Sequence, residues 1–461
     1  MSSKGSIAPG VIVLFALVVV GTGLGGMTQT ALNTMAADVL ADLQTDIGWG
    51  QWLTTIYTFC MGAAVPLASY VQRRLSIRTL MLISFGLYLF GSLCDFAALN
   101  FPMLIIGRVM EAVSTGILMP LLQTIAMTRF PETMHGTAMG FAGIALGFAP
   151  NMGPVLGGAI ASGIGWRYLF LILAVASVIL IGGTLVAVQE RDVKDRAATL
   201  DVASLCLSTF GFGGLLLAFT AAANVPLSDP LVWASLLVGI VCLVVFVRRQ
   251  RHLPLPLVNL RIFSFKAYRA NLVSQCFLYG CFVGMTLIIP LTIVEGAGYT
   301  AFEAGLVLFP GALAALVFEP GAGWLSDRFG TRRVAIAGGI MLSLGAVTIA
   351  FVPLSAPLWV FALCQMVRCM GLTTLIPSTT AAALGPLGRE GITTDGSATL
   401  IMCRQISAAL ATAVMVFLLK LFTTAATPLL GYGMALGFSG LLAVLCLLCV
   451  ILFVQNPKHL S

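Results

Sequence analysis

The stretch Gly323-Trp-Leu-Ser-Asp-Arg-Phe-Gly-Thr-Arg-Arg333 is a short charged turn between two long apolar runs. Each flanking run, 304–323 and 334–353, is as long as a helix that crosses the hydrocarbon core, which takes about 20 residues. The whole chain of 461 residues follows this plan, since 59% of it is hydrophobic and only 9% is charged. A soluble domain has about 25% charged residues, so lipid is the expected solvent.

Apolar runs of this length alternate with polar or Pro/Gly-rich breaks along the entire chain, and each run predicts one membrane span. The runs are 11–36, 51–70, 79–98, 103–126, 137–160, 167–188, 203–222, 231–247, 271–293, 304–323, 334–353, 358–383, 399–421 and 433–454. The predicted fold is therefore an all-α polytopic membrane protein with 14 transmembrane helices. The first run lacks a small-residue cleavage site and is expected to be a retained helix rather than a signal peptide.

Basic residues gather on one side of these spans. With both termini placed in the cytoplasm, 19 of the 24 Lys and Arg residues lie in inside segments. Short positive loops resist translocation, so a multi-pass cell-membrane protein with both termini cytoplasmic is expected. The loops predict an N-terminal six-helix bundle, two extra central spans with basic flanking loops, and a C-terminal six-helix bundle. Their bounds are 1–190, 191–269 and 270–461.

The two sets of six spans resemble each other. Ser69–Arg78 follows the second span as Gly323–Arg333 follows its counterpart, and Arg108 in the fourth span is matched by Arg368. Parallel repeats of this kind are typical of transporters whose two bundles rock about a central site.

At these residues the chain resembles the major facilitator superfamily, and within it the fourteen-span drug:proton antiporter family. The Gly323 stretch is similar to the superfamily's loop motif G-x-L-x-D-R-x-G-x-R-R. The resemblance implies a gate in which the glycine allows close helix approach, the acid accepts bonds from a neighbouring helix end, and the arginines pair with acids or lipid phosphate. The gating residues implied are Gly323, Asp327, Arg328, Gly330, Arg332 and Arg333.

The first copy of this loop departs from the motif. Ser69 and Ser76 stand where glycines are usual, and Arg73 stands where the acid is usual. A plain basic loop is therefore the default expectation for Gln72 to Arg78.

Ala149-Pro-Asn-Met-Gly-Pro-Val-Leu-Gly-Gly158 resembles the antiporter motif G-x-x-x-G-P-x-x-G-G of the fifth span, with Ala149 in place of the first glycine. The resemblance implies export rather than import. Small residues at this spacing let a helix pack closely against a neighbour, and the second proline kinks it. The alternative is that Gly and Pro are simply frequent in membrane helices. The packing residues implied are Gly153, Pro154, Gly157 and Gly158.

Ionisable residues inside the spans are functional candidates because lipid does not tolerate them cheaply. Arg108 and Glu111 resemble the family's R-x-x-Q-G element and share a helix face, which allows a proton carrier and its modulating base or a self-neutralising pair. Thr28 replaces the acid that the family carries in its first span, so coupling must use another group. Glu319 is a further coupling candidate or part of the inner rim, and Asp95 is expected to be interfacial.

Polar residues within the spans are expected to line a substrate cavity, with hydrogen bonding between helices as the alternative. They are Thr28, Gln29, Asn33, Tyr57, Gln275 and Arg404. The stretches Met119–Thr124 and Gly136–Gly140 are similar to the lincomycin-resistance-type subgroup. The eleven cysteines fall almost entirely in apolar runs and are interpreted as small core residues.

These features predict a secondary active exporter, which expels small amphipathic compounds in exchange for protons by alternating access, as in multidrug efflux. The expected partners are an amphipathic substrate, protons and the bilayer, with no nucleic acid, cofactor or metal, and a monomer. A transporter of lipid, siderophore or other metabolite, working as importer or uniporter, remains an alternative. A membrane-embedded enzyme finds little support, because the three histidines lie in predicted cytoplasmic segments without a catalytic set.

Overall fold

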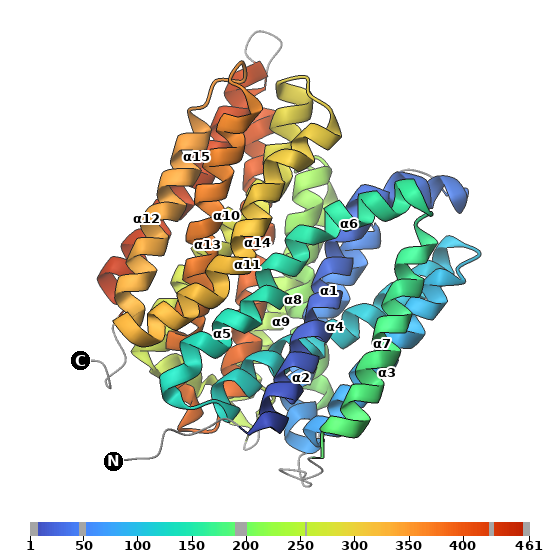
Figure 1. The fold of residues 1–461 in the computed structure, drawn as a ribbon, viewed down its shortest axis with the longest axis vertical. Coiled ribbons are helices and arrows are strands. Elements are labelled where there is room, and N and C mark those ends of the chain that lie inside the picture. Colours follow the sequence, from blue (N-terminus) through green and yellow to red (C-terminus); the bar gives the residue numbers. More distant parts are fainter. Residues whose placement is uncertain (1–7, 46–51, 190–200, 254–255, 424–427, 455–461) are drawn as a thin grey trace.

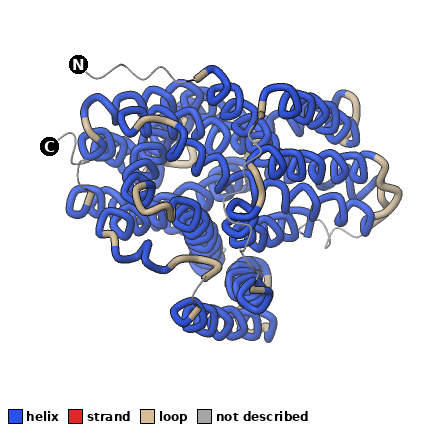
Figure 2. The backbone as a smooth tube through the Cα atoms, turned by 90° about the horizontal axis from the view of Figure 1, so that it is seen from below, coloured by secondary structure: helices blue, strands red, loops and turns tan. Residues whose placement is uncertain are grey.

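The computed structural model describes residues 8–45, 52–189, 201–253, 256–423 and 428–454. Throughout these ranges the chain is helical, with short connecting loops and no strand (Figure 2). The predicted fold class, an all-α polytopic membrane protein, is confirmed.

The helices of the first half and the central pair follow the predicted spans. They are α1 (Pro9–Asp42), α2 (Trp52–Arg74), α3 (Ile77–Phe96), α4 (Phe101–Arg129), η2 (Glu132–Met134), α5 (His135–Gly143), η3 (Ile144–Phe148), α6 (Ala149–Gly163), α7 (Arg167–Ala187), α8 (Val202–Asn224) and α9 (Pro230–His252). The π-helical segment η3 joins α5 to α6, so the three together form one span.

The second half begins after a short loop. It consists of η4 (Leu260–Ser264), α10 (Lys266–Leu291), η5 (Thr292–Gly296), α11 (Ala301–Phe329), α12 (Thr331–Ala350), α13 (Leu358–Gly388), α14 (Thr393–Phe422) and α15 (Pro428–Phe453). Here a second π-helical segment, η5, extends α10.

Thirteen helices among the described residues are long and apolar enough to cross a membrane. The helix α2 has 23 residues and lies where the second span is predicted, yet it is not one of these thirteen. The count of fourteen spans therefore stays a prediction, as does the division at residues 190 and 270.

Capping residues set where the helices turn at the membrane surfaces. Ser76 accepts a hydrogen bond from the Thr79 amide at the start of α3, and Asn100 accepts one from the Met103 amide at the start of α4. Each bond satisfies a first-turn N–H that has no partner within its own helix. Gly330 joins α11 to α12 with φ of 89°, a conformation that side chains disfavour. This explains why the second loop carries a glycine there.

The two halves repeat the same packing (Figure 1). In the first half α3 packs on α4 and α7, α2 on α4, and α1 on α6; in the second, α12 packs on α13 and α15, α11 on α13, and α10 on α14. The central pair, α8 and α9, lies at the junction of the halves, where α8 contacts both α2 and α14.

Close glycine contacts fix which residues of the halves correspond. A Cβ on Gly91 of α3 would lie 3.1 Å from the Glu111 amide nitrogen, and a Cβ on Gly345 of α12 would lie 2.5 Å from the Arg368 amide nitrogen. Arg368 therefore occupies the place of Glu111. The match of Arg368 with Arg108 from sequence was wrong by about one helical turn.

The fifth span packs on α1 through two of its glycines. A Cβ on Gly157 would lie 2.7 Å from the Ala31 carbonyl oxygen, and one on Gly153 would overlap the Thr30 hydroxyl. The backbones of α1 and α6 are therefore in direct contact, as small residues allow. Gly158 differs, because no described atom lies within 4 Å of a Cβ placed there. The packing role expected for Gly158 stays a prediction.

Carbonyl groups of α6 also accept hydrogen bonds from α1. The Thr30 hydroxyl donates to the Pro150 carbonyl over 2.6 Å, and the Thr34 hydroxyl donates to the Pro154 carbonyl over 3.2 Å. A proline within a helix leaves a backbone carbonyl one turn earlier without its N–H donor, so such helices favour side-chain donors nearby.

Leucine at position 157 should drive α6 away from α1, whereas leucine at position 158 should be tolerated. Overpacking a tight contact costs about 1–3 kcal/mol. We expect Gly157→Leu to lower the apparent melting temperature of the purified protein and its transport rate, with Gly158→Leu as the matched control. Equal effects of the two substitutions would contradict the described α1–α6 contact.

Candidate functional site

The two halves are joined at the end where α2, α4, α9 and α11 finish in basic residues, here called the basic end. There Asp327 in the last turn of α11 accepts three hydrogen bonds from the start of α5. The donors are the Gly136 amide at 2.7 Å, the Thr137 amide at 2.6 Å and the Thr137 hydroxyl at 2.7 Å. A carboxylate at a helix N-terminus accepts hydrogen bonds from N–H groups that have no partner within the helix, and its negative charge is stabilised by the positive end of the helix dipole. The contact implied for Asp327 is present, and we call it the Asp327 latch.

Glycines let the two helices of this latch touch. A Cβ on Gly323 would lie 3.0 Å from the Gly140 Cα and 2.8 Å from the Gly136 carbonyl carbon. The α5 and α11 backbones therefore meet without intervening side chains, and this holds Asp327 within reach of α5.

The arginines of this loop make their described contacts within the second half. Arg328 lies over the rings of Trp324 and Phe329 at 5.4 and 5.5 Å, and Arg332 donates to the Ile451 carbonyl over 3.0 Å. Arg333 is exposed.

The corresponding loop of the first half, at the end of α2, also contacts the opposite half, but through a base where the α11 loop uses an acid. Arg73 at the end of α2 lies 3.8 Å from Asp395 in the first turn of α14, and we call this pair the Arg73 latch. The same guanidinium donates to the carbonyls of Pro256 and Leu257 over 3.1 and 2.7 Å. The expectation of a plain basic loop was wrong at Arg73. Here the base is on α2 and the acid on α14, whereas Asp327 puts the acid on α11.

The loop that Arg73 holds is itself tied to the central helices. Gln250 of α9 accepts from the Val258 amide over 3.1 Å and donates to the Ser204 hydroxyl of α8 over 2.6 Å. Arg249 binds both oxygens of Asp201 at 2.8 and 3.0 Å, and these bonds lower the pKa of Asp201 to about 2. The carboxylate is therefore charged at physiological pH, and the central pair is coupled to the Arg73 latch.

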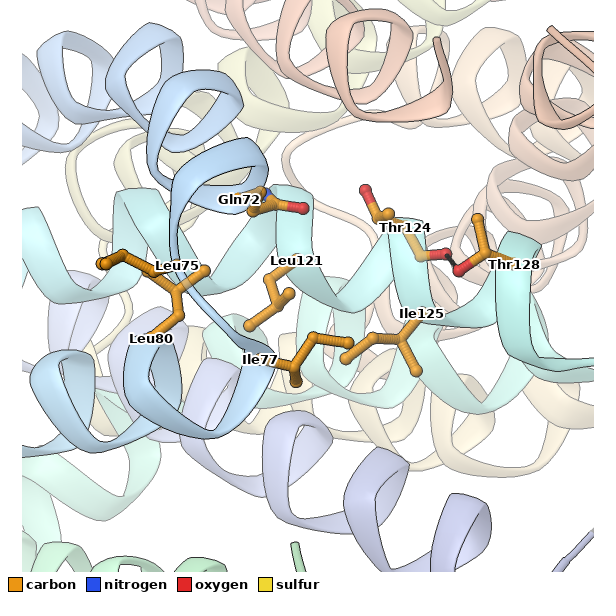
Figure 3. Close-up of a pocket in the computed structure, with 8 residues that line it drawn as sticks. All are labelled: Gln72, Leu75, Ile77, Leu80, Leu121, Thr124, Ile125 and Thr128. Atoms are coloured by element: carbon orange, nitrogen blue, oxygen red, sulfur yellow. Dashed lines mark hydrogen bonds between the residues drawn. The ribbon is translucent and has the colours of Figure 1, made fainter. Parts of the chain in front are cut away.

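Further polar contacts close the basic end. Gln123 of α4 accepts from Ser397 of α14 over 2.5 Å, and Arg389 binds Glu132 at 2.8 Å. A small pocket lies beside these contacts, between the end of α2 and α4 (Figure 3). It is lined by Gln72, Leu75, Ile77, Leu80, Leu121, Thr124, Ile125 and Thr128. Its volume of about 10 Å³ is room for one water, so a cargo does not fit there.

A buried ion pair lies near the opposite end, in α4. The Arg108 Nη1 is 2.7 Å from Glu111 Oε2, and both side chains are fully buried. Ser92 donates to the other Glu111 oxygen over 2.7 Å, and Arg108 donates to the Thr28 carbonyl over 3.3 Å. The guanidinium also lies 4.2 Å from the centre of the Tyr57 ring. The pairing that the i and i+3 spacing predicts is present.

A second carboxyl adjoins this pair. Asp95, in the last turn of α3, is fully buried, and neither of its oxygens has a hydrogen-bond partner in the described structure. Its carboxyl fills the space that a Cβ on Gly107 would occupy. Asp95 is thus buried within the protein near the outer end of α3, and its expected interfacial depth stays a prediction. With Arg108 and Glu111 it forms the α3–α4 charge cluster, in which two acids lie beside one guanidinium.

Two of the first-half residues expected to line a cavity, Thr28 of α1 and Tyr57 of α2, are buried and hydrogen-bonded to neighbouring helices. The Thr28 hydroxyl bonds to the Tyr88 hydroxyl over 2.5 Å, and the Tyr57 hydroxyl donates to an α1 carbonyl over 2.8 Å. Gln29 is partly exposed and lies 3.4 Å from the Thr58 hydroxyl. The side chain of Asn33 lies outside what the structure describes.

In the second half, the two predicted cavity residues share a partner. Gln275 of α10 and Arg404 of α14 both donate to the Thr380 hydroxyl, over 3.0 and 2.6 Å. Gln275 also donates to Thr379 over 2.5 Å, and Arg404 lies 4.8 Å from the Tyr279 ring centre. Both polar side chains are buried in this structure.

The remaining candidate acid, Glu319, lies between the two halves rather than at the inner rim. It is fully buried in the middle of α11 and faces the other half. A Cβ on Gly143 would lie 3.1 Å from Glu319 Oε2, and one on Gly147 would overlap Oε1. The sequence places Glu319 on a helix but contains no signal for this contact.

Comparison with known proteins settles the family. The model of the Major Facilitator Superfamily matches residues 18–412 and 271–461. The chain belongs to the Major Facilitator Superfamily. Its fold is that of transporters in this superfamily, as shown by the solved structure of the human organic anion transporter MFSD10, which has 14% identity and a TM-score of 0.67. The alignment covers 96% of this chain and all of that one (100%).

Bacterial members of the superfamily are similar in sequence over most of their length. The uncharacterized MFS-type transporter YcnB of Bacillus subtilis is 32% identical, covering 88% of this chain and 85% of the relative. Lincomycin resistance protein LmrB of Listeria monocytogenes is 28% identical, with 86% and 84% covered. Riboflavin transporter RibZ of Clostridioides difficile is 22% identical, with 87% and 86% covered. The predicted superfamily is confirmed, and the protein is a membrane transporter of this superfamily.

Exchanging the charges of Arg73 and Asp395 tests whether the Arg73 latch holds the basic end of this transporter closed. Arg73→Asp alone should separate α2 from α14 at the basic end because it places two acids together. Arg73→Asp combined with Asp395→Arg should restore closure, since it recreates an acid on α2 facing a partner on α14. The readout is the distance between spin labels at Thr133 and Lys266, exposed positions of the two halves, in a cysteine-free background. If the single and double variants give the same distances, the pair does not hold the halves together.

Proposed function

We propose that this protein exports small amphipathic compounds in exchange for protons, by alternating access between its two halves. The α3–α4 charge cluster is the observation that carries the proposal. Two buried carboxyls lie there beside one guanidinium, which pairs with Glu111 alone, so ionising Asp95 as well would leave an uncompensated negative charge in the protein interior. The cluster therefore holds one proton in any conformer that excludes water from it.

The position of the cluster suits a proton that enters from outside. Asp95 belongs to the last turn of α3, and Arg108 and Glu111 lie within the first three turns of α4, so all three are nearer the end opposite the basic end. The basic end is closed in this structure. Proton loss from the cluster would then be tied to a conformer that admits water or a cargo to Arg108.

The latches are proposed as the gate on the cytoplasmic side. Opening the basic end requires breaking both the Asp327 latch and the Arg73 latch, and glycine contacts between α5 and α11 make closure tight. This assigns the basic end to the cytoplasm, in agreement with the basic loops. We further propose that the protein works as a monomer in the cell membrane.

The cargo class is proposed from the chemistry of the interior and from the relatives. Apolar contacts discriminate poorly between similar shapes, so a largely apolar path favours a range of amphipathic compounds. The relative named a lincomycin resistance protein supports drug efflux. The relative named a riboflavin transporter supports a second candidate, carriage of a metabolite.

Replacing Glu111 by Gln should abolish proton-coupled export while preserving cargo binding. The amide cannot release a proton, and Arg108 loses its charged partner. The assay is cargo-induced proton release from energised inside-out vesicles, with neutral antibiotics, lipophilic cations, flavins and lipids as the panel. Asp38→Asn, which removes an exposed acid of α1, is the control and should behave like the unmodified protein.

The panel also separates the two candidate functions. Proton release induced by several unrelated antibiotics supports drug export, and release induced by flavins alone supports the metabolite carrier. Undiminished proton release by the Glu111→Gln variant would reject Glu111 as the carrier.

A further inference from the structure

Glu319 stands out among the buried ionisable groups because the contact between the halves encloses it. It lies ten residues before the end of α11, about 15 Å from the basic end by the helical rise. Its side chain is fully buried against Gly143 and Gly147 of the other half. Closing α5 onto α11 therefore seals this carboxyl inside the protein.

The enclosing surface offers the carboxyl no opposite charge. Neither oxygen has a hydrogen-bond partner of ordinary geometry among the described residues, where the Phe148 amide is the one backbone group that lies close enough to interact with the carboxyl. From α5, η3 and α6, residues 136–163 contribute no Asp, Glu, Lys, Arg or His. A carboxylate sealed in this way would be an unpaired buried charge, which proteins avoid by keeping the group neutral.

The other helices around Glu319 contribute no fixed charge to it. The ionisable groups facing it are Cys369 of α13 and Tyr279 of α10, both neutral near pH 7. Arg368 of α13 directs its guanidinium to Gln365, at 2.8 Å, and to Cys369. On α12 the charged residues lie in its first turn at the basic end.

The shape of the fifth span fits the carboxyl. The π-helical segment η3 begins after Gly143 and contains Gly147, the two residues that leave room for Glu319. Single π turns within helices are frequent at functional positions. A side chain at either glycine would displace the acid, so this part of the fifth span forms a recess for it.

We propose that Glu319 is a gate-proton site, protonated while the basic end is closed and ionised when α5 and α11 separate. Closure takes up one proton from the water at the basic end, and opening returns one proton to the same water. The gate proton therefore does not cross the membrane. When the end opposite the basic end is open to external protons, the basic end is closed and Glu319 is sealed. Glu319 therefore cannot pick up an external proton, as a group that carries protons across the membrane must.

The pH dependence has a definite sign. The neutral acid fits only the closed basic end, whereas the ionised acid requires water and hence the open basic end. Acidification at the basic end therefore favours closure, and alkalinisation favours opening. A cell with an acidified cytoplasm would hold the gate shut without any change in cargo.

The experiment uses the same spin-label pair at Thr133 and Lys266 in the full chain, between about pH 5 and 8.5. We expect the closed fraction of the otherwise unmodified protein to fall as pH rises. Without cargo, Glu319→Gln should have the same high closed fraction across the range, because the amide is always neutral, and only cargo should then open it. Glu303→Gln changes a carboxylate at the opposite end of the same helix, where it caps the first turn through Thr300, and should keep the unmodified pH response.

Two results would overturn the proposal. One is a pH response in Glu319→Gln equal to that of the unmodified protein, and the other is pH-independent opening of the unmodified protein. The inference rests on the alternating access of the proposed function. Absence of opening at any pH, with or without cargo, would reject both, whereas opening without pH dependence rejects the gate proton alone.

A proton count provides a second measurement. Glu319→Gln should release as many protons for each cargo molecule exported as the unmodified protein does, because its proton returns to the side it came from. A lower number would make Glu319 a transported carrier and would contradict the proposal.

Discussion

A charge inside the hydrocarbon region must be paired, neutralised or wetted, and this constraint organises the interior of the protein. Arg108 meets it through Glu111, and Arg404 meets it through a threonine hydroxyl and a tyrosine ring. Asp95 and Glu319 have no such compensation in the closed conformer. In the proposed mechanism each therefore holds a proton while it is sealed, and a motion that admits water changes the protonation of the protein. This is how a helical bundle can couple shape to proton binding.

The basic end meets a different constraint, because its polar groups must be satisfied across two halves that also have to separate. The Asp327 latch uses a carboxylate against a helix N-terminus, and the Arg73 latch uses an ion pair with the charges exchanged. Both are polar contacts near the end of the protein, and such contacts can be broken and remade more readily than a packed core. The loop from α9 joins the Arg73 latch to the central pair, which gives these two helices a connection to gating.

The fold was accessible from sequence because apolar run length and basic-loop placement report directly on lipid and topology. The Asp327 contact was equally accessible through its motif. Other features depended on three-dimensional contacts that periodicity does not encode. Arg368 was paired one turn from its true counterpart because a helix repeats its faces every turn. The burial of Asp95 was not predicted, since it depends on the absence of a side chain at Gly107. Arg73 and Asp395 are far apart in the chain, and only the packed halves bring them together.

The account is tested most directly by infrared difference spectroscopy of the purified protein, which reports protonated carboxyl groups. The spectrum of protein held closed at the basic end by a cross-link between the halves is compared with that of protein free to open. The account predicts absorption from neutral buried carboxyls in the closed form that weakens when the basic end opens. Identical spectra in this region for the closed and open forms would contradict the claim that conformation controls protonation of the interior.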